Sequence, residues 1–154
     1  MSYLDLREEL VRRFREDQEL SRKKAWTMLE KVYDQNALWL KNVVNTLGWP
    51  DKQKVGDEGE QSAWLIAQHA SDIDFQERCL HYLQHLPQTR ERLEYIAYLT
   101  DRILVQKGEQ QIYGTQFHHR EPSPIVDQKN LDKRRQQIGL ELFKEYYQRM
   151  KQLA

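Results

Sequence analysis

The stretch Trp64-Leu-Ile-Ala-Gln-His-Ala70 is the most apolar run of an otherwise polar chain, yet it holds Gln68 and His69 side by side. An apolar helix with an embedded amide and imidazole needs partners for both, because a buried polar group without a hydrogen bond costs about 1–3 kcal/mol. The stretch therefore predicts a buried helix around which polar side chains from the rest of the chain are organised.

Length and composition favour a small helical protein. A chain of 154 residues fits one domain. Its hydrophobic content of 39% is low and its charged content of 31% is high, against typical values of about 45–50% and about 25%. We expect a thin core, heavily solvated outer faces and a single helical domain over residues 1–154.

Charge and cysteine content restrict the class of partner and the compartment. The formal net charge is zero, so no global attraction to nucleic acid or to an anionic membrane is expected. Lys133-Arg-Arg135 is a short basic cluster without interleaved aromatic residues, which gives no clear nucleic-acid signal. Cys79 is the only cysteine, and neither a signal region nor a membrane-spanning apolar run is present. A cytoplasmic protein is expected.

Apolar residues at helical spacing predict an all-α fold of six to seven helices. Ser2 is expected to cap the first helix, and Ser21 to cap a second helix that pairs with it in antiparallel fashion and ends before Gly48. A polar loop over residues 49–57 precedes a third helix from about Glu58 to Ala70. Later in the chain, residues 111–117 alternate loosely around a glycine, which predicts one short extended segment or hairpin.

The first candidate constellation is His69 with Asp72 and Gln76. The three residues lie three and four positions apart, although Ser71-Asp72 is typical of a helix break. A histidine beside a carboxylate can act as a general base whose tautomer the acid fixes. The alternative is a core histidine bonded to a backbone carbonyl, with Asp72 as a helix cap.

A second set of polar side chains surrounds Asp101 and Arg102. Arg102 can hold a carboxylate or phosphate in bidentate fashion, or it can form a structural salt bridge. Tyr113 and Gln116, in a strip of neutral hydrogen-bonding side chains, suit recognition of a polar, uncharged ligand. The same strip could instead pin a loop to the helices.

Metal and cofactor patterns are weak. His81 and His85 are spaced to pinch a metal from one helix turn, but two ligands do not make a site and a solvated helix face is the simpler interpretation. Neither a phosphate-binding loop nor a nucleophile elbow is present, so the sequence names no cofactor and predicts no metal site.

Several segments together resemble a bacterial family that is catalogued only as a domain of unknown function. The most specific are Ala63-Trp-Leu-Ile-Ala-Gln-His-Ala70, Ala97-Tyr-Leu-Thr-Asp-Arg102, Tyr113-Gly-Thr-Gln-Phe117, and the set Asp132, Arg134-Arg135 and Gly139-Leu140. The resemblance covers nearly the whole chain and implies that these pieces belong to one fold. It implies no activity, so no catalytic residue is carried over from it.

Two hypotheses follow from the scattered polar residues. The first is a small-molecule-binding protein with hydrolytic chemistry, in which His69 is a general base oriented by Asp101 or Asp72, and Arg102 and Gln116 hold a small polar ligand. The second is a non-enzymatic interaction module of the antitoxin, immunity or adaptor type, whose polar residues form a buried structural network that leaves helix faces for a protein partner.

Overall fold

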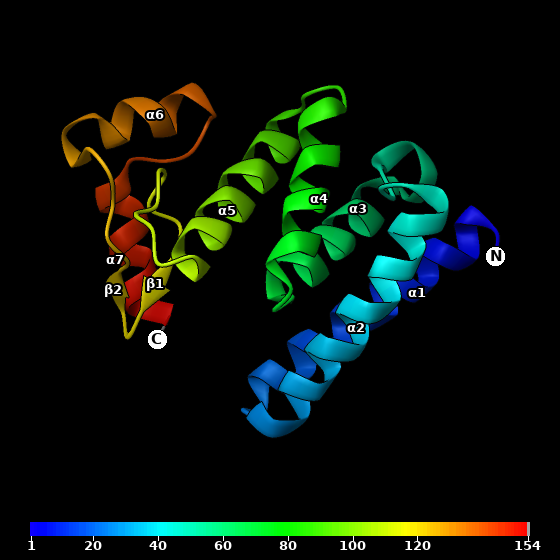
Figure 1. Cartoon of the computed structure of the whole chain (residues 1–154). Helices are drawn as coiled ribbons and strands as arrows, with labels where there is room; N and C mark the ends of the chain where they lie inside the picture. Colours follow the sequence, from blue (N-terminus) through cyan, green and yellow to red (C-terminus); the bar gives the residue numbers. More distant parts are fainter. Residues whose placement is uncertain (154) are drawn as a thin grey trace. The chain divides into compact units, whose positions relative to one another are not determined.

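The computed structural model describes residues 1–153, which form seven α-helices and one two-stranded sheet in two compact units (Figure 1). Unit 1, Met1–Tyr82, contains α1 (Tyr3–Arg22), α2 (Trp26–Leu47), α3 (Lys52–His69) and most of α4 (Ile73–His85). Unit 2, from Leu83 onward, contains α5 (Arg90–Gln106), β1 (Phe117–His118), β2 (Glu121–Pro122), η1 (Gln128–Asn130), α6 (Leu131–Gln137) and α7 (Phe143–Leu153). The mainly helical fold class is confirmed, whereas a single domain over residues 1–154 stays a prediction.

In unit 1, α1 runs antiparallel to α2, and α3 packs against both (Figure 1). The capping box at Ser2 and the glycine end of α2 at Gly48 are confirmed. The predicted cap at Ser21 is wrong, because α1 continues through Arg22 and the chain reverses only at Lys24, whose φ of 53° is left-handed. Leu6, Leu10 and Leu40 are fully buried along these helices.

The third helix begins earlier than predicted. Asp51 accepts hydrogen bonds from the N–H groups of Gln53 and Lys54 and so caps a first turn, and Gly56 then kinks the helix with a φ of 73°. The buried indole of Trp49 donates to Glu60 Oε1 over 3.1 Å. Of the segment expected to be a loop, the part from Lys52 onward is therefore helical, and Trp49 is tied to the body of α3.

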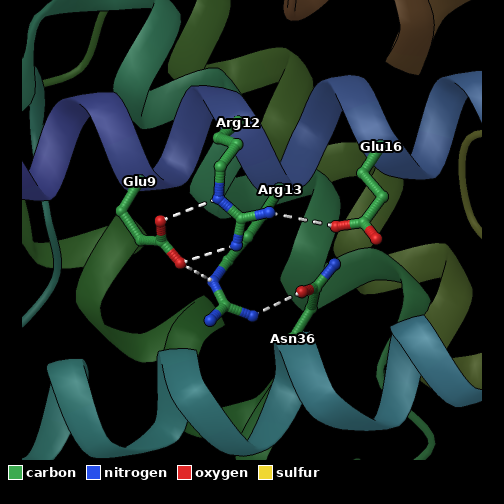
Figure 2. A network of polar contacts seen from close by, with 5 residues as sticks. All are labelled: Glu9, Arg12, Arg13, Glu16 and Asn36. Carbon is green, nitrogen blue, oxygen red and sulfur yellow. Dashed lines mark hydrogen bonds and ion pairs between the residues drawn. The ribbon is translucent and has the colours of Figure 1, made fainter.

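A network of charged side chains on α1 reaches α2 through Arg13. Figure 2 shows the guanidinium groups of Arg12 and Arg13 on α1 both reaching Glu9, while Arg12 also reaches Glu16. Arg13 Nη1 extends further and donates to Asn36 Oδ1 on α2 over 2.7 Å. Asn36 is buried, and its Nδ2 has no hydrogen-bond partner among residues 1–153.

In unit 2, the segment between α5 and the sheet is held by its own side chains. Gln111 Nε2 donates to the carbonyls of Gln116 (2.9 Å) and Ser123 (2.8 Å), and its Oε1 accepts the Gln116 N–H at 2.8 Å. The hairpin pairs Phe117 with Pro122 and thus begins at the C-terminal end of the segment expected to be extended. Residues 112–114 bend sharply instead, and residues 115–116 have no regular secondary structure.

None of the described helices combines the length and the apolar character needed to cross a bilayer.

Candidate functional site

The imidazole of His69, at the end of α3, is held by a carboxylate from α1. His69 Nδ1 lies 2.8 Å from Asp17 Oδ2, and the side chain of Asp17 is only 2% exposed. Gln18 Nε2 donates to the other oxygen of Asp17 over 3.2 Å. An ionised Asp17 can only accept hydrogen bonds, so it places the proton of the neutral imidazole on Nδ1.

The other ring nitrogen of His69 is open. The ring packs on Tyr33 with centroids 4.3 Å apart, which fixes its plane, while 20% of the side chain stays exposed. Nε2 makes no hydrogen bond with any described residue and is not among the fully buried atoms. A neutral imidazole protonated on Nδ1 and open at Nε2 has the lone pair that a general base needs.

The residues expected to accompany His69 have other partners. Asp72 is an exposed cap of α4: it accepts the N–H of Phe75 and pairs with Lys41 at 2.8 Å, and this hydrogen bond to Lys41 is the main reason that its pKa is lowered. Gln76 is fully buried, and its Nε2 donates to the carbonyls of Ala67, Gln68 and Ala70 at the end of α3. Asp72 therefore ties the start of α4 to α2, and Gln76 ties α4 to the end of α3.

Asp101, on α5, organises the turn of unit 2. Its Oδ1 accepts the N–H groups of Ile112 (2.8 Å) and Tyr113 (3.1 Å), and its Oδ2 accepts the N–H (3.0 Å) and hydroxyl (2.8 Å) of Thr115. Asp101 is fully buried. Burial raises its pKa while these donors oppose the rise, and burial together with the Asp101 charge raises the pKa of the Tyr113 phenol. The four donors all come from residues 112–115, so the carboxylate holds this turn.

The same hydrogen bonds orient Gln116. The Thr115 hydroxyl donates to Asp101, which leaves its oxygen to accept Gln116 Nε2 at 3.1 Å. Gln116 Oε1 then makes no hydrogen bond with the described residues. Gln116 and Arg102 line one groove of about 510 Å³ beside the hairpin. Val105, Phe117 and two prolines supply apolar surface there, which is the usual make-up of a small-molecule site.

The structure thus brings together only part of the predicted set. Arg102 and Gln116 line one groove of unit 2. Asp101 does not line this groove, but it orients Gln116 through its hydrogen bond with Thr115. Tyr113 contributes its backbone N–H to Asp101. His69 belongs to unit 1, where Asp17 is its partner. Within residues 1–153, no three His, Cys, Asp or Glu side chains form a group that could hold a metal ion.

Residues 17–153 match a model described as a family of unknown function (DUF6624). The chain belongs to this family. The match covers Asp17, which holds His69, and nearly all of both units, in agreement with the resemblance seen in the sequence. No curated protein and no solved structure matches this DUF6624 chain. Membership of DUF6624 therefore assigns no activity, and the chemistry of the site must be argued from its geometry.

Two residues of interest were not among the predicted site residues. Asp17 continues the apolar stripe of buried Leu6 and Leu10 and half-buried Phe14 along α1, and a carboxylate on an apolar stripe signals a buried partner. Arg135 is 1% exposed although it belongs to the charged run Lys133-Arg-Arg135. No sequence signal separates it from its exposed neighbours.

Proposed function

We propose that this protein binds a small polar molecule in the groove of unit 2, with Arg102 and Gln116 as the residues that orient it. The observation that carries the proposal is the chain of hydrogen bonds from Asp101 through Thr115 to Gln116, which fixes the Gln116 amide in the lining of a groove of ligand size and leaves its oxygen without a protein partner. Preorganised polar groups in an apolar groove give orientation at low entropic cost.

The chemistry of the ligand follows from these groups. Gln116 Oε1 accepts a hydrogen bond, so it favours a ligand with an N–H or O–H donor. The Arg102 guanidinium presents several donors in a fixed fork and favours a carbonyl or carboxylate oxygen. We therefore expect a small amide-like or amino-acid-like molecule that carries a donor and an acceptor on adjacent atoms.

Ligand-observed NMR with a library of small amides and amino acids tests this proposal. Saturation transfer is expected for binders to the wild-type protein and is expected to be lost with Arg102→Gln. Lys129→Gln, which removes an exposed positive charge of the same unit outside this groove, is the matched control and should retain binding. Binders that respond equally to both variants, or no binders at all, would contradict the proposal.

A second candidate function is hydrolysis, with His69 as general base. The Asp17–His69 pair supports it, because a buried carboxylate that fixes the tautomer and an open Nε2 are what proton abstraction from a water or hydroxyl requires. Asp17 takes the role that Asp72 or Asp101 was expected to fill.

Hydrolysis of p-nitrophenyl acetate is a probe for a reactive imidazole. His69→Gln is expected to reduce the rate to that of free buffer, and Asp17→Asn to reduce it strongly, because an asparagine amide can donate to Nδ1 and move the proton to Nε2. His85→Ala, at the exposed end of α4, is the control and should leave the rate unchanged. Equal rates for wild type and His69→Gln would refute the role of His69.

The interaction module remains the rival, and the closed set of hydrogen bonds around Asp101 is the observation in its favour. It predicts full folding, no binder in the library and no His69-dependent hydrolysis. These three results together would favour binding of a protein partner over binding of a small molecule.

A further inference from the structure

A second pocket of unit 2, about 280 Å³ in volume, is lined by three arginines from three helices. Arg90 begins α5, Arg135 lies on α6 and Arg149 lies on α7. Glu94 and Glu141 also line the pocket, so its charged side chains sum to one net positive charge. The groove of Arg102 and Gln116 has none of these residues in its lining.

Arg135 is the central feature of this pocket. It is 1% exposed, its Nε donates to the Glu141 carbonyl and its Nη1 donates to the Tyr113 carbonyl, both over 2.7 Å. Its guanidinium carbon lies 4.8 Å from the ring centroid of Tyr146. All of these partners are neutral. Among residues 1–153, no carboxylate forms an ion pair with Arg135, and its Nη2 makes no hydrogen bond.

Burial of a guanidinium group without a counter-ion is unfavourable in free energy. Taking an ion out of water costs several kcal/mol, and only a charge partner with good geometry repays most of that cost. Burial also lowers the pKa of the Arg135 guanidinium, which reflects the same cost. Because carbonyls and aromatic rings return only part of it, the protein keeps a local positive potential that an anion in the pocket would neutralise.

The neighbouring charges fit this interpretation. Glu141 has a partner of its own, since its carboxylate pairs with Arg149. Arg90 makes no ion pair with any described residue, and its stem lies against Gly139, where the absence of a side chain leaves room beside it. Arg90 and Arg135 are therefore the two cations of the pocket without a carboxylate partner.

We propose that this pocket is an oxyanion site, in which Arg135 Nη2 and Arg90 bind the phosphate or carboxylate group of a small molecule. Arginine suits this ligand because its planar fork of donors matches two oxygens of a phosphate or carboxylate. The volume is at the small end of ligand sites, so it admits the anionic group with few further atoms.

NMR titration of ¹⁵N-labelled protein tests the proposal. Inorganic phosphate in one series and acetate in another are added at constant ionic strength, with chloride as the balancing anion. We expect saturable shifts of the Arg135 side-chain signals and of backbone amides around Gly139. The tighter of the two series identifies phosphate or carboxylate as the preferred group.

Arg90→Gln is the decisive variant because Arg90 is exposed and its replacement leaves the core intact. The dissociation constant is expected to rise at least tenfold, whereas Arg7→Gln in unit 1 should leave it unchanged. A general salting effect of phosphate would act on both variants alike. Linear, non-saturating shifts in both series, or equal dissociation constants for wild type and Arg90→Gln, would overturn the proposal.

Discussion

Replacement of Asp101 by asparagine should destabilise unit 2 more than any conservative change on its surface. The Oδ1 atom of the carboxylate accepts two hydrogen bonds from residues 112–115 and Oδ2 accepts three, because the Tyr113 N–H is shared between the two oxygens. An asparagine keeps one oxygen and replaces the other with an NH₂ group. Whichever way the amide turns, the N–H or hydroxyl groups that donated to the replaced oxygen then face another donor, the NH₂ group.

The magnitude follows from counting the groups that lose a partner. The amide is best placed with its NH₂ toward Thr115, whose hydroxyl can rotate and accept, while the Thr115 N–H stays without an acceptor. One buried unpaired N–H costs about 1–3 kcal/mol, and the remaining bonds lose the added strength of a charged acceptor. We expect a loss of about 3 kcal/mol in the free energy of unfolding, a large fraction of the typical 5–15 kcal/mol.

Urea unfolding followed by circular dichroism measures this loss. All four tryptophans belong to residues 1–82, so tryptophan fluorescence reports unit 1 while circular dichroism reports both units. Asp127→Asn is the control, because Asp127 is half-exposed with a φ of 43°, a conformation that asparagine tolerates well, and it should change stability by less than about 0.5 kcal/mol. Hydrogen exchange at Ile112, Tyr113 and Thr115 should accelerate in Asp101→Asn. Unchanged exchange and an unchanged midpoint would refute the anchoring role.

Two further predictions concern the core. Gly114→Ala should destabilise the protein by about 2–4 kcal/mol, because the position has a φ of 70° and a Cβ would lie 2.9 Å from Phe143 Cε2. The control is Gly108→Ala, at a position with a φ of 77° and open space around it. It should destabilise the protein by only about 1 kcal/mol in the same unfolding assay. Burial raises the pKa of the Cys79 thiol from 9.0 to about 12, so at pH 8 the reactive thiolate is about a thousandfold rarer than in an ordinary cysteine. Ellman's reagent should therefore label Cys79 in urea and leave the native protein unlabelled, and rapid labelling of native protein would show that the thiol is accessible.

Most helices could be predicted because their signals are local. Ser2 and Gly48 cap or end helices at the predicted positions, and each does so through neighbours within a few residues. The errors have local causes too. Ser21 has the chemistry of a cap, but the helix continues past it. Trp26 is apolar and lies at helical spacing with the buried Leu29, yet it is 58% exposed. The periodicity of apolar residues predicts which face of a helix is apolar. It does not predict which turns of that face a neighbouring helix covers and which stay exposed.

The candidate site residues also differ in whether a local sequence signal could reveal them. His69 could be named as a candidate from the sequence because an imidazole inside an apolar run must have a partner. That partner, Asp17, could not be named, because it lies 52 positions away and meets His69 only where α1 packs on α3. Asp101 shows the opposite case: its donors follow within 14 positions, at the turn around Gly114, so an acidic residue on a helix before a glycine-centred turn is a signal that sequence alone can supply. Arg135 has no such signal, since its burial depends on the rings of α7 and the carbonyls of two turns at once. A charged residue thus becomes a candidate site when the fold removes its solvent without supplying a counter-charge, and that condition is set by three-dimensional packing.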